Sequence, residues 1–202
     1  MTGNPLLNRS TVFDEFLEKL VVEEKDNSVL REKVDFMSNV AVDKLFAQAE
    51  GHIISLKGPA LLALAAHKDP RCETLIKEFL EDQSQILKSF AIRAVQVFHS
   101  QELAKELCIL LKDPSSMIRL KAMEAIAKIN FEILIPYLFE LSEDPVWFVR
   151  EKLIEISATH HEAERTLLFL CHDQNKSVKE LAEKTLKNIL DIETDTSISY
   201  QG

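Results

Sequence analysis

The chain has 202 residues, a formal net charge of −9 at pH 7 and a hydrophobic content of 46%. This acidic balance argues against a nucleic-acid-binding surface or an anionic-membrane surface, because both need an excess of lysine and arginine. The three cysteines lie in apolar helical patterns without metal-ligand spacing, so we expect reduced thiols and neither a bound metal nor a disulfide framework. The sequence shows no signal-peptide pattern and no membrane-spanning stretch, which favours a cytoplasmic location.

Apolar residues at helical spacing predict an all-α chain. Residues 1–10 are expected to form a flexible leader, followed by a helix over about 11–24 and another that ends near residue 39. Paired helices are then predicted over residues 40–50 and 53–66, 70–80 and 83–98, 101–111 and 115–129, 131–142 and 146–159, and 161–171 and 175–190. The acidic segment 191–202 is expected to be a disordered tail, so that the repeats span residues 11–190.

A basic residue recurs at a nearly fixed interval, near the start of the second helix of each predicted pair. The intervals are 31, 31, 31 and 29 residues, and the positions are Lys57, Lys88, Arg119, Arg150 and Lys179. An apolar residue directly precedes each of these basic residues, and an alanine or leucine lies three positions after each of them. Six positions before the base, the last four copies hold Asp82, Asp113, Asp144 and Asp173. Self-similarity at such a period indicates a stack of repeats.

Each repeated position has a predicted structural role. The aspartate is expected to cap the second helix. Pro114 and Pro145 follow their aspartates directly, where a proline suits the first helical turn. The alanine three positions after the base, such as Ala122, is expected to face inward and to permit close helix packing.

This repeated pattern consists of an aspartate, a turn, an apolar residue followed by a basic one, and an alanine. It resembles the short HEAT-like repeats, of about 30 residues, found in bacterial and lyase-associated proteins. The resemblance covers roughly residues 26–190, with Arg31 marking a degenerate first copy. It implies a right-handed α-solenoid of about six two-helix repeats, with the second helices lining the concave side. The resemblance also implies that each aspartate pairs with the basic residue of an adjacent repeat, in a structural ladder rather than a binding stripe. It does not imply one particular function.

Catalytic and metal-binding motifs are not indicated, so we expect neither enzymatic activity nor a cofactor. His161-Glu162 resembles the opening of a His-Glu-x-x-His zinc helix, but Arg165 stands where the second histidine is required. The single His-Glu pair also falls short of the iron site of the deoxyhypusine hydroxylases. The acidic balance and the lone Trp147 argue against a HEAT-like DNA glycosylase. The phycobilin lyases have a similar repeat length, so a lyase or enzyme subunit that binds a small ligand in the groove stays the alternative.

The leading hypothesis is a monomeric, non-catalytic scaffold or adaptor that binds a partner protein or peptide on the concave face of its second helices. In the middle repeats, apolar residues one and four positions after the base lie beside acidic residues, a combination that suits a basic amphipathic helix or peptide. The candidate partner-binding residues are Ile92, Leu120, Met123, Glu124, Glu151, Ile154 and Glu155. Alternatively, the apolar members widen the core. Trp147-Phe148 either packs between repeats or anchors a partner.

Overall fold

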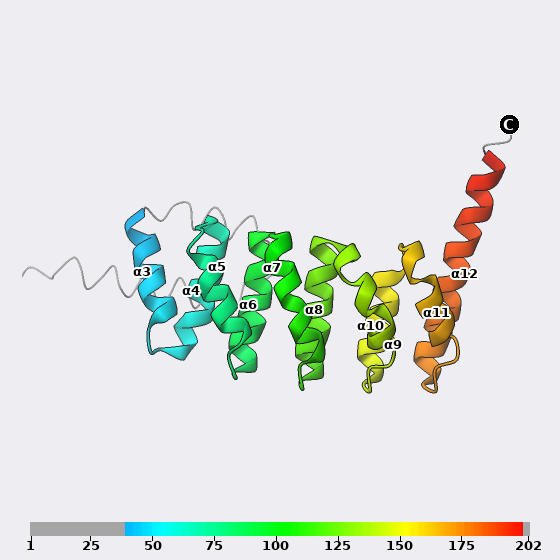
Figure 1. The fold of residues 1–202 in the computed structure, drawn as a ribbon, viewed down its shortest axis with the longest axis horizontal. Coiled ribbons are helices and arrows are strands. Elements are labelled where there is room, and N and C mark those ends of the chain that lie inside the picture. The colour runs from blue at the N-terminus through cyan, green and yellow to red at the C-terminus, as the bar shows by residue number, and fades with distance from the viewer. Residues whose placement is uncertain (1–38, 200–202) are drawn as a thin grey trace, which may run out of the picture. The chain divides into compact units, whose positions relative to one another are not determined.

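The computed structural model describes residues 39–199, and every regular element within this range is a helix (Figure 1). The predicted all-α repeat fold is therefore confirmed for this part of the chain. The expected leader, the helix over 11–24 and the degenerate copy around Arg31 lie outside the described residues. Within the described part, no helix is long and apolar enough to cross a membrane.

The chain divides into two compact units between Glu106 and Leu107. Unit 1 contains α3 (Asn39–Glu50), α4 (Ile54–His67), α5 (Cys72–Leu80), α6 (Gln85–Phe98) and α7 (Gln101–Glu106). Unit 2 contains the α-helices α8 (Ser116–Ile129), α9 (Leu138–Ser142), α10 (Trp147–Ser157), α11 (Glu164–Leu170) and α12 (Lys176–Ser199), and the 3-10 helices η1 (Leu107–Lys112), η2 (Phe131–Ile133), η3 (Ile135–Tyr137) and η4 (His161–Ala163). These bounds agree closely with the predicted helix pairs. The single solenoid over residues 11–190 stays a prediction.

In unit 1, α4 packs against both α3 and α6. The core side of α4 consists almost entirely of buried alanines and leucines. Gly58 allows α4 to approach α6 closely, because a Cβ atom at this position would lie only 2.1 Å from Cδ2 of Phe90. The α4–α6 contact therefore depends on the missing side chain of Gly58.

In unit 2, the second helices α8, α10 and α12 pack side by side, and the first helices η1, α9 and α11 pack against them as a second layer (Figure 1). Ile118, Ala122 and Ile126 form the buried stripe of α8. The corresponding residues one repeat later are Val149, Leu153 and Ser157, which are also buried. The predicted inward position of Ala122 is thus confirmed. Ser157 is the polar exception, and among the described residues its buried Oγ has no hydrogen-bond partner.

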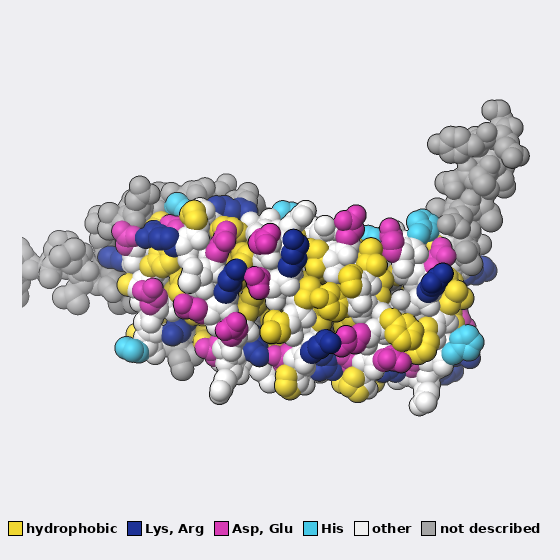
Figure 2. Space-filling model, viewed as in Figure 1, with side chains coloured by type: hydrophobic (Ala, Val, Ile, Leu, Met, Phe, Trp, Pro, Cys, Tyr) yellow, Lys and Arg dark blue, Asp and Glu magenta, His cyan; other side chains and the backbone are white. Residues whose placement is uncertain are grey.

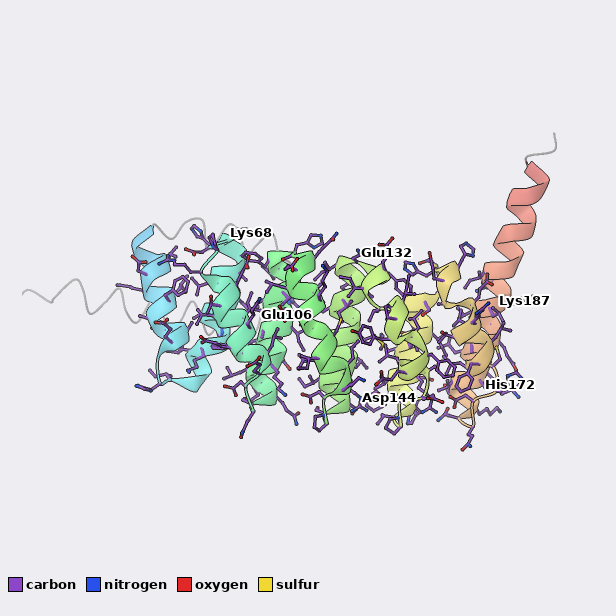
Figure 3. The ribbon with its side chains drawn as sticks, in the orientation of Figure 1. Lys68, Glu106, Glu132, Asp144, His172 and Lys187 are labelled. Carbon is purple, nitrogen blue, oxygen red and sulfur yellow. The ribbon has the colours of Figure 1, made fainter. Side chains whose placement is uncertain are left out.

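The repeated aspartates do not cap the second helices as predicted. Each accepts a hydrogen bond from the backbone N–H two residues later, as between Asp113 Oδ1 and Ser115 N at 2.9 Å and between Asp144 Oδ1 and Val146 N at 2.8 Å. This local bond closes a turn before the helix begins. Pro114 and Pro145 accordingly lie in these turns rather than in the first helical turn. Figure 3 shows Asp144 and His172 at the same end of unit 2, with Glu132 at the opposite end.

At α6 and α12 the residue two positions after the aspartate caps the helix, whereas Ser115 at α8 and Val146 at α10 make no side-chain cap bond. Ser84 Oγ accepts a hydrogen bond from Leu87 N in α6, at 3.4 Å. Asn175 Oδ1 accepts from Ser177 N at 2.9 Å and from Val178 N at 3.3 Å at the start of α12. The sequence prediction therefore identified the correct turn and assigned the cap to the wrong residue within it.

The C-terminal segment differs from the predicted disordered tail, because α12 continues through Ser199. Residues 191–199 extend an existing helix, and adding a residue to a formed helix avoids the cost of nucleation. The polar composition that predicted disorder does not by itself prevent this extension.

Candidate functional site

The predicted acidic candidates and Leu120 lie on the exposed side of α8 and α10 in unit 2. Leu120, Glu124 and Glu151 are partly exposed, and Glu155 is exposed. Leu120 and Glu124 are four residues apart on α8, and Glu151 and Glu155 are four apart on α10. Residues at this spacing lie on the same side of a helix. The structure therefore places these four candidates on one layer of unit 2.

The other three predicted candidates do not reach the surface. Ile92, Met123 and Ile154 are all buried, the last two completely. Each lies four positions after the repeated basic residue, directly after the core position that lies three positions after it. Consecutive second helices pack directly against one another, and this packing covers the side chain at the fourth position. These three side chains belong to the core, in agreement with the alternative that the apolar residues widen it.

The acidic side chains of this layer already have partners within unit 2. Lys152 Nζ lies 3.3 Å from Oε1 of Glu124 and also donates to Glu155. These bonds, chiefly the one to Glu155, raise the pKa of Lys152. Glu151 accepts a hydrogen bond from Ser177 Oγ of α12. The carboxylates thus connect α8 to α10 and α10 to α12, and their charge is partly compensated.

Trp147 is the feature that sequence reasoning left undecided. Its side chain is 47% exposed at the first residue of α10, and its ring meets that of Phe148 edge to face, with centroids 6.0 Å apart. Met117, which is also exposed, holds the position of Phe148 in the preceding repeat. We call the set Met117, Leu120, Glu124, Trp147, Glu151 and Glu155 the second-helix face. Aromatic side chains on such faces are the residues that most often dominate binding.

The histidines and cysteines form local contacts. The His160 ring stacks on Phe131 with centroids 3.6 Å apart, and His161 Nδ1 lies 3.6 Å from Glu164. Burial raises the pKa of the Cys72 thiol to about 12, so this thiol stays protonated. Among the residues whose side chains are described, no group of three or more His, Cys, Asp or Glu is arranged to hold a metal ion.

Comparison with known proteins supports the repeat assignment. The family model for HEAT repeats matches residues 72–158. The structure is similar to a designed armadillo repeat protein, YIII(Dq.V1)4CPAF, in complex with peptide (KR)4, with 18% identity and a TM-score of 0.50, over 87% of this chain and 98% of that chain. A second designed armadillo repeat protein, YIII(Dq)4CqI, has 17% identity and a TM-score of 0.48 over the same shares. No curated protein matches the sequence.

The matched segment begins at Cys72, the first residue of α5, and ends just after α10. It includes the turns of Asp82, Asp113 and Asp144, where the repeated motif is most regular. The motif, the helix pairs and the family match agree over this range. The predicted resemblance to HEAT repeats is therefore confirmed over residues 72–158.

Proposed function

We propose that this chain is a non-catalytic scaffold or adaptor and that its second-helix face binds a partner protein or peptide. The observation that carries the proposal is the exposure of Trp147, the single tryptophan of the chain, at the start of α10. A tryptophan buries a large area when it is covered and loses little conformational entropy, so it contributes strongly to binding. The fold adds support, since the similar designed armadillo repeat protein is described in complex with the peptide (KR)4.

The chemistry of the face defines the partner. Trp147 and Met117 offer an apolar contact for a hydrophobic side chain of the partner. Glu124, Glu151 and Glu155 outnumber Lys152, so a lysine or arginine beside the hydrophobic residue is favoured over an acidic one. Because Lys152 and Ser177 already engage these carboxylates, we assign most of the binding energy to the apolar contact.

The experiment compares affinity purification from the source cell with the wild-type chain and with the Leu120→Asp/Trp147→Ala variant. Both side chains are at least partly exposed, so the variant should keep the wild-type melting temperature. A specific partner should be recovered by the wild type and lost by the variant. Ile86→Ala, at an exposed aliphatic residue of α6 in unit 1, is the matched control and should retain the partner.

The recovered partner can then be titrated directly, because Trp147 is the single tryptophan of the chain. Its fluorescence should shift to shorter wavelength when a hydrophobic side chain covers the indole. If the folded variant retains the partner, or if the Trp147 emission does not change at saturation, the second-helix face is not the binding site.

A further inference from the structure

A second group of exposed apolar side chains crosses the first helices of unit 2. Ile109 of η1 is 69% exposed, Phe139 of α9 is 57% exposed, and Leu168 and Phe169 of α11 are 51% and 44% exposed. We call these four residues the first-helix stripe. The rings of Phe139 and Phe169 lie 5.2 Å apart, so the stripe is continuous from α9 to α11. Figure 2 shows hydrophobic side chains gathered over these helices, with acidic and some basic side chains around them.

The fold does not require apolar residues at these positions. In unit 1 the residues that precede Cys108 and Ile109 by one period are Lys77 and Glu78 of α5, and both are exposed. Lys77 forms an ion pair with Glu106 at 3.1 Å. The same part of a first helix therefore accepts charged residues where it faces water. Contiguous exposed apolar patches on soluble proteins usually mark interaction sites.

The surroundings of the stripe are acidic. The first-helix segments 107–112, 131–143 and 161–170 contain five glutamates against one lysine and one arginine, a formal charge of −3. The glutamates are Glu132, Glu140, Glu143, Glu162 and Glu164. Lys112 pairs with Glu140 at 2.9 Å, which leaves the negative charge in excess. By contrast, α8, α10 and residues 176–189 of α12 carry seven lysines, two arginines and five glutamates, three of which belong to the second-helix face. Counted over a whole layer, the acidic excess is therefore found in the first helices.

This charge selects among the possible occupants of the stripe. A second copy of the chain would bring an identical acidic rim against the first. The chain's own amphipathic segment, residues 11–24, contains five acidic residues and one lysine, so its charge is also of the wrong sign. Like charges placed opposite one another disfavour association, whereas opposite charges steer and orient it. A partner with an apolar face and basic flanks can contact both the apolar stripe and the acidic residues around it.

We propose that the first-helix stripe is a docking site for a basic amphipathic helix of another protein. One face of that helix would place aliphatic or aromatic side chains, spaced three and four residues apart, on Phe139, Leu168 and Phe169. Its flanking lysines or arginines would lie beside Glu140 and Glu143. The stripe and the second-helix face belong to different layers of unit 2. With both surfaces, the chain could join two partners at once.

The test uses a labelled synthetic helix with leucine and phenylalanine on one face and lysine and arginine on its flanks. Two control peptides carry glutamate in place of each basic residue, or the same residues in scrambled order. Fluorescence anisotropy with the full chain should show at least about tenfold tighter binding of the basic amphipathic peptide than of either control. Phe139→Ser/Leu168→Ser should weaken that binding at least about tenfold, with an unchanged melting temperature.

Matched variants separate this proposal from the proposed function. Lys77→Ser/Glu78→Ser, at related positions of unit 1, should leave the affinity for the basic peptide unchanged, and Trp147→Ala should weaken it less than Phe139→Ser/Leu168→Ser does. If the serine variant of the stripe unfolds, the charge reversal Glu140→Lys/Glu143→Lys keeps the apolar residues and should weaken basic-peptide binding while strengthening glutamate-peptide binding.

Four results would overturn the proposal. One is equal binding of the scrambled peptide, and another is unchanged binding by the folded stripe variant or by the charge-reversal variant. The third is a wild-type dimer in sedimentation equilibrium that becomes monomeric in the stripe variant, because the stripe would then serve self-association. Loss of binding in Trp147→Ala alone would move the peptide to the second-helix face and would equally overturn the proposal.

Discussion

Arg119 and Asp144 form a two-point ion pair that connects consecutive repeats of unit 2. Arg119 Nε lies 2.6 Å from Asp144 Oδ2, and Nη2 lies 2.8 Å from Oδ1. The third guanidinium nitrogen, Nη1, donates to the carbonyl oxygen of Asp113 at 2.8 Å. The same guanidinium therefore binds the turn that precedes its own helix and the turn of the next repeat. The hydrogen bond to Asp144 raises the pKa of Arg119.

One repeat later, Arg150 makes an equivalent set of bonds. Its Nε and Nη2 lie 2.7 and 2.8 Å from the Asp173 carboxylate, and Nη1 donates to the carbonyl oxygen of Asp144 at 2.6 Å. Asp144 thus bonds to Arg119 through its side chain and to Arg150 through its backbone. The predicted ladder of aspartate and basic residues is present at these two steps and is a structural feature.

The ladder predicts a large loss of stability when one partner is removed. The Arg119 and Asp144 side chains are only 10% and 5% exposed, so Asp144→Ala leaves a buried guanidinium without its carboxylate. Such a change typically costs about 3–5 kcal/mol. Chemical denaturation should show this decrease in the free energy of unfolding. Lys112→Ala, which breaks the exposed pair with Glu140, should cost less than about 1 kcal/mol.

The apolar replacement Arg119→Met/Asp144→Leu provides the second comparison. Replacing both members of a buried pair is far less harmful than removing one. The double variant should therefore unfold at a higher denaturant concentration than Asp144→Ala. A double variant no more stable than the single one would mean that the guanidinium bond to Asp113 O matters more than the ion pair.

Acid should weaken the last step of the ladder. Burial of the Asp173 carboxylate raises its pKa, but hydrogen bonds from Arg150 and Asn175 N and the charge of Arg150 outweigh this, and the pKa lies below 3.8. A carboxylate with a lowered pKa stabilises the fold above the ordinary pKa and loses this contribution as pH falls through the folded-state value. Melting temperatures measured from pH 6 down to about pH 3 should therefore fall.

The control for this pH dependence is a neutral side chain of the same shape. Asp173→Asn should be less stable than the wild type at pH 6, and the difference should shrink as the pH falls below 3.8. A difference that stays constant over this range would show that the carboxylate charge of Asp173 does not contribute to stability.

Gly58→Ala should destabilise unit 1. The added Cβ would lie within 2.6 Å of three atoms of the Phe90 ring, and the ring must move to accommodate it. Overpacking of this kind costs about 1–3 kcal/mol, which exceeds the gain in helix propensity from glycine to alanine of about 1 kcal/mol. Thermal melting should show the loss. The loss of stability caused by Gly58→Ala should be smaller in the Phe90→Leu background than in the wild type, because the smaller side chain leaves space for the methyl group. The comparison is between Gly58→Ala/Phe90→Leu and Phe90→Leu alone.

Ala122→Leu should destabilise unit 2 by about 1–3 kcal/mol. Ala122 is completely buried in the middle of α8, so three further carbon atoms cannot be placed without moving a neighbouring helix. Lys128→Leu, at an exposed position of the same helix, is the control and should change the free energy of unfolding by less than about 0.5 kcal/mol. Equal stability of the two variants would contradict the packing described for α8.

Ser157→Ala should stabilise unit 2. The Ser157 hydroxyl is buried without a hydrogen-bond partner, which costs about 1–3 kcal/mol relative to its exposure to water. Alanine has nearly the same size and no polar atom to satisfy, so the variant should melt at a higher temperature. A lower melting temperature would indicate that the hydroxyl has a favourable contact that this variant removes.

The local features of the fold could be predicted from the sequence. Apart from the continuation of α12 to Ser199, the helix pairs from residue 39 onward were predicted to within a few residues, because apolar spacing, the turn residues and the periodic basic residue all act within one repeat. The buried stripe of Ile118, Ala122 and Ile126 followed from the same spacing. The partners of the ladder were predicted by the resemblance to HEAT-like repeats, and the two pairs join neighbouring repeats at separations of 25 residues (Arg119–Asp144) and 23 residues (Arg150–Asp173).

The exposure of individual side chains was decided only by the tertiary structure. Met123 and Leu120 are both apolar and three residues apart, yet only Met123 is completely buried. The exposed Trp147 and Phe139 could not be distinguished by pattern from aromatic residues of the core. Burial depends on which neighbouring helix covers a position and how closely it approaches, as the Gly58–Phe90 contact shows. The distance between two helices is set by how side chains from both of them pack together. The helical periodicity of one segment carries no information about the side chains of the other helix.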